Sequence, residues 1–259
     1  MGRENKIIVQ KFGGTSVANF ERMRRACEHV KRAYEMGFGV VVTVSAMAGE
    51  TDRLINLGKS AVAKTYDDEM DVLVSTGEQV SCSIFSMILR ENNIKAKSYL
   101  GFQIRITTDE NYTNARIIEI ETEKLISDIK QGIVPVIAGF QGVTRDGRIT
   151  TLGRGGSDTT AVAIAAALNA KICEIYTDVP GVFTTDPNLV ASAKKLRFIS
   201  YEEMVELASL GAKVLQIRSV EIAARFNIPI HVRSTFSNEI GTIVATDLKK
   251  ASEILKMIG

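Results

Sequence analysis

The stretch IIVQKFGGTSV, residues 7–17, decides the fold. Its first six residues form an apolar run rich in β-branched side chains, which is typical of a buried strand. Two glycines follow, and Asn19 can then cap a helix. That helix would carry an apolar face at helical spacing, made of Phe20, Met23, Cys27, Val30 and Tyr34. Gly37 ends the helix and residues 38–44 read as a second buried strand, so the chain opens with a strand–helix–strand unit.

The same alternation continues through the chain. Residues 133–138, 171–177 and 228–233 read as further strands, and residues 157–168 read as a helix that starts at Ser157 or Asp158. Strands that alternate with helices predict an α/β protein, a three-layer α/β/α sandwich with a mainly parallel central sheet. Ligands of such sheets bind beyond the carboxyl ends of the strands. Residues 145–148 predict a hairpin turn between two short strands.

The composition argues against several classes of function and site. The 32 basic and 30 acidic residues nearly balance and are spread along the chain, which argues against a nucleic-acid partner. Cys27, Cys82 and Cys173 show no C-x-x-C spacing, so we expect neither a disulfide framework nor a zinc site. We also expect no membrane span and no signal peptide, and therefore a cytoplasmic protein.

Two glycine-rich segments are candidate anion sites. In the first, Gly13 and Gly14 follow a strand and precede a helix, and Lys11 adds a mobile positive charge. In the second, Arg154 lies among glycines just before a helix, and arginine can grip a carboxylate with two hydrogen bonds. A plain strand-to-helix turn at the first segment, and a helix cap at Asp158, are the structural alternatives.

Three further segments carry weaker signals. Ser75 and Glu78 match a capping box at a helix start, although Glu78 could instead pair with a substrate ammonium. Residues 176–187 form a strand end and a turn-rich loop where a nucleotide base could rest, and Lys213 could meet phosphate or be solvated. His29 and His231 are the only histidines, and we expect both to be structural.

Together these segments resemble the catalytic domain of aspartate kinases, in the amino acid kinase family. The matching motifs occur in family order across nearly the whole chain, which makes the resemblance specific. They are KFGGTSV at 11–17, VSAMAGETDRL at 44–54, STGEQVS at 75–81, GFQG at 139–142, TTLGRGGSDTTA at 150–161, YTDVPGVFTTDP at 176–187 and GAKVLQIRSVEIA at 211–223.

The resemblance implies ATP as phosphoryl donor and assigns a nucleotide side to the site. Lys11, Gly13 and Gly14 resemble the family's phosphate cradle, Lys213 its second cation, and Asp158 the carboxylate that orients both lysines. Further nucleotide contacts are implied at Ser45, Thr177, Asp178 and Phe183. Mg²⁺ would be carried on the nucleotide phosphates, and we predict no protein metal ligand.

The resemblance likewise implies L-aspartate as acceptor, with 4-phospho-L-aspartate as product and the first step of lysine, threonine and methionine biosynthesis as role. Arg154 resembles the residue that holds the substrate α-carboxylate. The other implied substrate contacts are Thr51, Glu78, Gly155, Gly156 and Ser157. Because a side-chain carboxylate is already ionised at neutral pH, with a reference pKa of ~3.9, no general base is required.

The sequence departs from the family pattern in places. Asn188 stands where arginine is usual, and Phe183 where tyrosine is common. We expect one amino acid kinase domain over 1–259, with an aspartate-binding lobe to about residue 150, a nucleotide-binding lobe to about 246 and a terminal segment from 247 to 259.

The chain stops where family members usually continue into regulatory ACT domains. We therefore expect no feedback inhibition by lysine or threonine, whether the short chain is a truncation or a natural form. A homodimer and a monomer both stay open. So do two other functions, a non-catalytic subunit of a regulated kinase and a different kinase of the same family.

Overall fold

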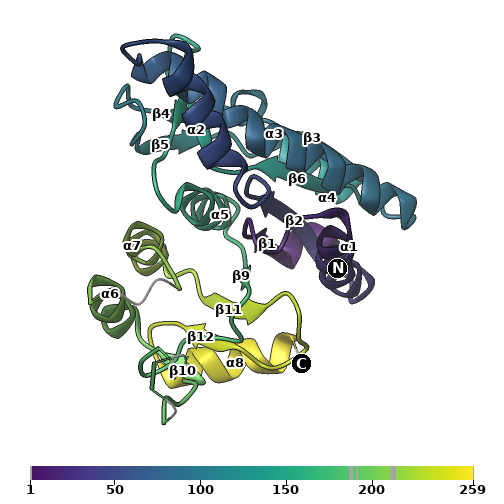
Figure 1. The fold of residues 1–259 in the computed structure, drawn as a ribbon. Coiled ribbons are helices and arrows are strands. Elements are labelled where there is room, and N and C mark those ends of the chain that lie inside the picture. Colours follow the sequence, from purple (N-terminus) through teal and green to yellow (C-terminus); the bar gives the residue numbers. More distant parts are fainter. Residues whose placement is uncertain (1, 187–188, 191, 211–213, 259) are drawn as a thin grey trace.

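The computed structural model describes residues 2–186, 189–190, 192–210 and 214–258, and a large sheet organises them. Its strand order is β10-β12-β11-β9-β1-β2-β6-β3, and only the β11–β12 pairing is antiparallel (Figure 1). The strands are β1 (Ile7–Phe12), β2 (Gly39–Val44), β3 (Ala96–Tyr99), β6 (Val134–Ala138), β9 (Ile172–Thr177), β10 (Phe198–Ile199), β11 (Ile230–Ser234) and β12 (Thr242–Val244). The predicted mainly parallel α/β sheet is confirmed.

Helices cover both faces of this sheet. One face packs against α1 (Phe20–Glu35), α3 (Asp67–Glu91) and α8 (Leu248–Ile258). The other face packs against α4 (Glu123–Lys130), α5 (Gly156–Ala167), α6 (Tyr201–Ser209) and α7 (Ile217–Phe226). Helix α2 (Glu50–Ala61) lies along α3. Two short 3₁₀ turns, η1 (Arg3–Asn5) and η2 (Gly101–Ile104), complete the helical elements of the described residues.

A second, smaller sheet stands beside the large one, in the order β5-β4-β7-β8. Its strands are β4 (Ile106–Thr108), β5 (Ile117–Ile120), β7 (Gln141–Val143) and β8 (Ile149–Thr151). Strands β7 and β8 pair antiparallel, which confirms the hairpin predicted around residues 145–148. The arrangement places the end of β8 just before the glycine-rich start of α5.

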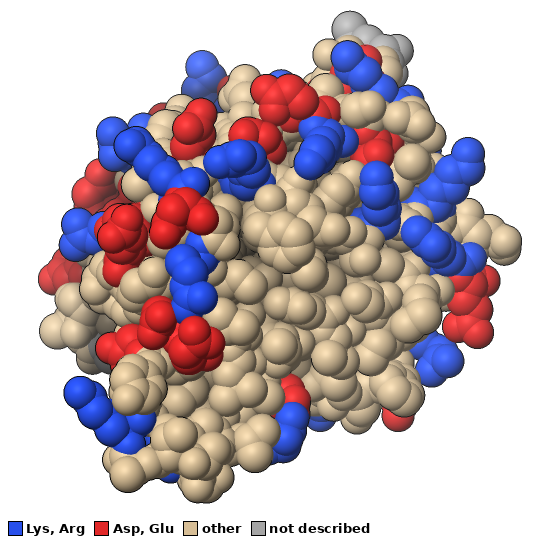
Figure 2. Space-filling model, turned by 90° about the horizontal axis from the view of Figure 1, so that it is seen from above, with Lys and Arg blue, Asp and Glu red and all other residues tan. Residues whose placement is uncertain are grey.

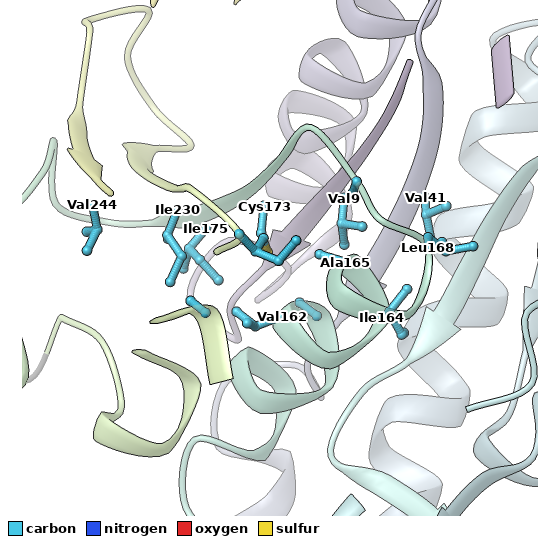
Figure 3. Packing of buried hydrophobic residues seen from close by; sticks show 14 of the residues in the cluster. Val9, Val41, Val162, Ile164, Ala165, Leu168, Cys173, Ile175, Ile230 and Val244 are labelled. Carbon is cyan, nitrogen blue, oxygen red and sulfur yellow. The ribbon is translucent and has the colours of Figure 1, made fainter. Parts of the chain in front are cut away.

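Strand β1 is the centre of the core because its residues alternate between the two helical layers. Ile7 and Val9 pack toward α5, whereas Ile8 and Phe12 pack toward α1 and α3. Figure 3 shows the α5 side, where Val9 and Val41 of neighbouring strands meet the helix at Val162, Ile164 and Ala165. The helix that follows the second glycine-rich segment is therefore fixed directly on the central strands.

The start of α1 follows the sequence prediction, with one exception on its apolar face. The Asn19 side chain accepts a hydrogen bond from the Arg22 N–H at 2.9 Å, as an N-cap does. Met23, Cys27 and Val30 are buried, but Phe20 is 56% exposed. Phe20 is the first residue of the helix, and the buried face of α1 begins at Met23.

The predicted helix start at Ser75 is wrong, whereas helix α5 begins at Gly156, one residue before the predicted Ser157. Ser75 and Glu78 lie inside α3, which begins eight residues before Ser75, so they do not form a capping box. Helix α5 is preceded by Gly155 in the left-handed region, and neither Ser157 nor Asp158 caps it. In both places a side chain in a cap-like pattern is buried and contacts another segment instead. Glu78 accepts from the Ala46 N–H, and Asp158 pairs with Lys11.

Among the described residues, α3 alone is long and apolar enough to span a membrane, with a mean hydropathy of 1.4. Of its most apolar stretch, 56% is buried inside the protein, as in the core helix of a globular domain. Figure 2 shows the face above α2 and α3 in Figure 1, where Lys and Arg lie among Asp and Glu around an uncharged central area. The charges on this face are thus dispersed and form no basic stripe.

We predict that Phe85→Ala lowers the free energy of unfolding by about 3–5 kcal/mol, because Phe85 is fully buried and its ring stacks on Phe12 at 5.4 Å. Urea denaturation measures this change. Phe20→Ala is the matched control, and it should cost about 0.5 kcal/mol or less since Phe20 is exposed. Equal losses in the two variants would contradict the assigned core.

Candidate active site

A buried ion pair marks the carboxyl end of the sheet. Lys11, near the end of β1, places Nζ 2.6 Å from Oδ1 of Asp158 in the first turn of α5. Both side chains are about nine-tenths buried, with exposed fractions of 11% and 10%. A Cβ atom added to Gly13 would lie 3.3 Å from the Lys11 Nζ, so the ammonium group borders the glycine turn. The carboxylate of Asp158 thus fixes the position of the Lys11 ammonium beside this turn.

The glycine turn is anchored to the ends of two strands. The Gly13 N–H donates to the Tyr176 carbonyl of β9 at 3.2 Å. The hydroxyls of Ser16 and Thr235 lie 2.6 Å apart, and Thr235 follows β11 directly. The Thr235 N–H in turn donates to the Thr177 carbonyl at 2.9 Å. The turn therefore moves with the sheet edge and not as a free loop.

The start of α5 forms the opposite wall. Gly153 and Gly155 both adopt positive φ, +73° and +70°, which glycine tolerates without strain. Gly155 is further required because a Cβ there would lie 1.8 Å from Cγ of Gln216. Arg154 between them is exposed and makes no hydrogen bond or ion pair with any residue of the described ranges. Its guanidinium is available to a ligand.

Glu78 reaches the site from the middle of α3. It is only 3% exposed, and its Oε1 accepts a hydrogen bond from the Ala46 N–H at 3.0 Å. Its buried Oε2 has no hydrogen-bond partner among the residues that the structure describes. Burial raises the pKa of Glu78 to about 7, although the Ala46 N–H pulls it down. A buried acceptor with a free oxygen suits a positively charged donor.

These elements surround a cleft of about 540 Å³ beyond the strand ends, as the α/β architecture predicts. The structure brings into it most of the residues proposed from the sequence. They are Lys11, Gly14, Ser45, Thr51, Glu78, Arg154, Gly155, Gly156, Ser157 and Asp158. Gly13 lies at its rim, beside Lys11.

The remaining predicted residues lie elsewhere. Thr177 and Asp178 end β9 beside the glycine turn, where the Thr177 hydroxyl donates to the Asp178 carboxylate at 3.1 Å. Phe183 is farther along, in an isolated bridge with Lys195. None of these three lines the cleft. Lys213 and Asn188 lie outside the described residues.

The histidines are buried away from the cleft lining. The His29 ring donates from Nε2 to the Thr235 carbonyl at 3.0 Å, and Nδ1 of His231 lies 3.4 Å from Glu174. Burial lowers the pKa of both rings, despite the Thr235 carbonyl and the Glu174 carboxylate. Both are thus neutral structural groups at neutral pH.

Sequence reasoning missed several residues of the cleft. Asp71 is the most informative, because it is fully buried on α3 seven residues before Glu78. That spacing puts two carboxylates on one helical face, a signal that a helix read from residue 67 would have contained. The other missed lining residues are Ala46, Met47, Ala48, Gly49, Asp52, Ile55, Met70, Val74, Thr113, Phe140, Thr151 and Gly153.

The arrangement can hold a zwitterion next to a polyanion. Glu78 offers an acceptor and Arg154 a donor at different points of the cleft, while Lys11 and the glycine turn offer positive groups. Among the described residues no three His, Cys, Asp or Glu side chains gather as metal ligands. The side chains of Glu78, Arg154 and Lys11 can act on a ligand through placement and charge.

Comparisons with known proteins identify the family of the chain. The amino acid kinase family matches residues 6–234. An aspartate kinase of Pseudomonas putida is 52% identical over 247 residues, which are 95% of this chain and 60% of that protein. The chain thus spans about 60% of the length of the curated relatives it matches.

Two solved structures show the same fold. Aspartokinase III of E. coli in complex with aspartate and ADP has a TM-score of 0.86 at 32% identity, over 93% of this chain and 65% of that one. Aspartate kinase from Synechocystis has a TM-score of 0.83 at 48% identity, over 93% of this chain and 40% of that one. The similarity covers both walls of the cleft.

We predict a pH-dependent effect of Glu78→Gln on stability. Because the pKa of Glu78 is raised from 4.5 to about 7, the folded state binds its proton more tightly, and the free energy of unfolding falls as pH rises through that window. Glutamine does not titrate, so the free energy of unfolding of the variant lacks this decrease. Relative to wild type, its free energy of unfolding should rise by about 2–3 kcal/mol between pH 5 and pH 8.

Urea denaturation at a series of pH values measures this difference. Glu28→Gln, at an exposed position of α1, is the control and should follow the wild-type curve. A Glu78→Gln curve parallel to wild type would contradict the raised pKa.

Proposed function

The chain belongs to the amino acid kinase family, and from this membership we propose that it acts as an aspartate kinase. The reaction would transfer the γ-phosphoryl group of ATP to the β-carboxylate of L-aspartate and release ADP and 4-phospho-L-aspartate. The role that follows is the first step of lysine, threonine and methionine biosynthesis, in the cytoplasm. The 52% identity to an aspartate kinase supports the proposal.

One observation carries the choice of acceptor. A single cleft holds the unpartnered Oε2 of Glu78 and the unpaired guanidinium of Arg154. An α-amino acid presents an ammonium and a carboxylate, and these groups match Glu78 and Arg154 respectively. An acceptor without a free amino group, such as N-acetylglutamate or UMP, leaves the buried Glu78 oxygen unpaired, which is costly. The neighbouring Thr51 and Ser157 supply further polar contacts.

The catalytic strategy follows from the charges. The β-carboxylate is already a nucleophile at neutral pH, with a reference pKa of ~3.9, so no side chain has to remove a proton. The obstacle is repulsion between this anion and the triphosphate. Lys11 and the N–H group of Gly14 meet the charge of the transferring group, and Asp158 holds the lysine in position. In this proposal Lys213 supplies a second cation.

Mg²⁺ is assigned to the nucleotide. Magnesium usually keeps several waters and binds through substrate phosphates together with one or two carboxylates. When bound, it would neutralise phosphate charge and orient the triphosphate.

The decisive experiment measures ADP release with ATP and Mg²⁺ while the acceptor is varied among aspartate, glutamate, N-acetylglutamate and UMP. Hydroxylamine is included to trap an acyl phosphate. We expect ADP and hydroxamate with aspartate alone. Turnover with another acceptor would assign a different kinase of the family. ATP binding without turnover for any acceptor would favour a non-catalytic subunit.

Two substitutions separate the roles of the cations. Lys11→Ala should lower kcat by about a hundredfold or more, because it removes charge that acts on the transition state. Arg154→Ala should mainly raise the KM for aspartate and leave the KM for ATP unchanged, because it contacts the acceptor. Steady-state kinetics with each substrate varied in turn measures both.

Arg145→Ala provides the control, since Arg145 is exposed in the hairpin turn and does not line the cleft. It should behave as wild type. If Arg154→Ala changed the KM for ATP as much as that for aspartate, its assignment to the acceptor would be wrong. Unchanged kinetics in Lys11→Ala would remove Lys11 from the mechanism.

A further inference from the structure

The turn at residues 113 and 114 forms part of the cleft wall in a strained conformation. Thr113 has φ +64°, a left-handed value that β-branched residues rarely adopt. A Cβ on Gly153 would lie 3.0 Å from the Thr113 carbonyl oxygen and 2.9 Å from Oδ1 of Asn114. The turn therefore presses against the residue that precedes Arg154. Such a conformation persists only where surrounding groups enforce it.

One support comes from Asp71 on α3. Its Oδ2 accepts hydrogen bonds from the Thr113 N–H at 2.9 Å and from the Thr151 N–H at 2.8 Å. Its Oδ1 accepts from the Thr151 hydroxyl at 2.6 Å. The carboxylate is fully buried and uses both oxygens. Asp71 thus ties the turn to the end of β8, two residues before Gly153.

The other support comes from Arg218 on α7. Its Nη2 donates to Oδ1 of Asn114 at 2.6 Å. Its Nη1 donates to the Leu152 carbonyl at 2.9 Å and to the Ala115 carbonyl at 3.3 Å. The guanidinium therefore holds the turn on one side and the residue before Gly153 on the other. A planar group with several donors is suited to such a bridge.

The same helix also touches the next part of the wall. Gln216, which precedes α7, packs against Gly155, and Lys213 lies five residues before Arg218 in the sequence. Helix α7 has its closest helical neighbours in α5 and α6. Among the described residues, the hydrogen bonds of Arg218 all go to the turn and to Leu152, on the Arg154 side of the cleft.

We propose that Asp71 and Arg218 are positioning residues that clamp the turn at 113–114 against Gly153 and so preset Arg154 for the acceptor. The inference rests on the proposed function, since it names aspartate as the ligand on this side. Neither residue touches the transferring group. Loosening the clamp should therefore weaken aspartate binding and leave ATP binding unchanged.

The test uses Arg218→Met, which keeps the length of the side chain but removes every donor, and Arg218→Lys, which keeps a charge. Arg225→Met, an exposed position on the same helix, is the matched control. Hydrogen–deuterium exchange of the segment 109–118 is measured without ligands. The KM values for aspartate and ATP and the kcat are measured in parallel, and Asp71→Asn is treated in the same way.

We expect faster exchange of residues 109–118 in Arg218→Met and Asp71→Asn, with a KM for aspartate raised about tenfold. The KM for ATP should stay constant, and Arg218→Lys should recover part of the loss. Unchanged exchange would overturn the clamp whether or not the chain is an aspartate kinase. Faster exchange with equal changes in both KM values would reduce both residues to a general structural role and also overturn it.

Failure of the proposed function would look different. Wild-type protein would then show no aspartate-dependent turnover, and aspartate would produce no heat in titration calorimetry. The exchange comparison between wild type, Arg218→Met and Arg225→Met needs no substrate, so it would still decide whether the turn is clamped.

Discussion

The ion pair between Lys11 and Asp158 is the contact on which the rest of the site depends. It joins the central strand β1 to the helix α5 across 2.6 Å, and both partners are largely buried. Burying two charges costs several kcal/mol per ion, and their attraction roughly offsets that cost only with good geometry. Asp158 lies in the first turn of α5, where the partial positive charge of the helix N-terminus also stabilises its carboxylate. Strand and helix must therefore keep their mutual placement if the pair is to persist.

The buried acids differ in how completely they are satisfied, and this difference separates their roles. Glu174, in the sheet layer behind α1, is contacted by Gln10 at 2.7 Å, Arg233 at 3.0 Å and the hydroxyl of Tyr176 at 3.2 Å. Although burial raises its pKa, His231 and Arg233 hold it well below the ordinary value. Glu174 is thus a permanent anion that fixes β1, β9 and β11 in register.

Asp71 and Glu78 extend this comparison along one helix. Asp71 uses both oxygens on backbone and side-chain donors, so nothing remains for a ligand. Glu78 has one oxygen on the Ala46 N–H and the other free in the cleft. Two carboxylates seven residues apart on the same face therefore differ, because one holds the wall and the other keeps an unpartnered oxygen at the cleft. Burial alone does not distinguish them, but the count of satisfied oxygens does.

The sequence predicts the sheet and the two glycine-rich walls because those features depend on local pattern. The apolar strands, the Asn19 cap and the hairpin near residue 146 all follow from spacing within a short window. The wrong helix start at Ser75 has a tertiary cause. Polar residues in the middle of α3 imitate a cap, and only the fold shows that they face a cleft.

The positioning groups were beyond sequence reasoning for the same reason. Arg218 lies 104 residues from Asn114 in the chain, and their hydrogen bond exists only once α7 packs beside α5. The left-handed φ of Thr113 is equally invisible, because threonine carries no signal for it. Contacts of this kind join distant segments, and neither segment carries a sequence pattern of its own that signals the contact. Local spacing therefore cannot predict such contacts.

The proposed reaction brings two anions to a chain whose formal net charge is only +2. Before ligands bind, Lys11 is neutralised by Asp158, and Arg154 is the exposed cation of the described cleft lining apart from this pair. A lysine held in this way needs no reorganisation when charge develops nearby, and electrostatic stabilisation is strongest where the groups are already oriented. In the proposed reaction Asp158 thus contributes to catalysis by holding Lys11 in place, and it exchanges no proton. The free energy needed to bury the pair is supplied when the chain folds. The cation is therefore already in place when the transition state forms.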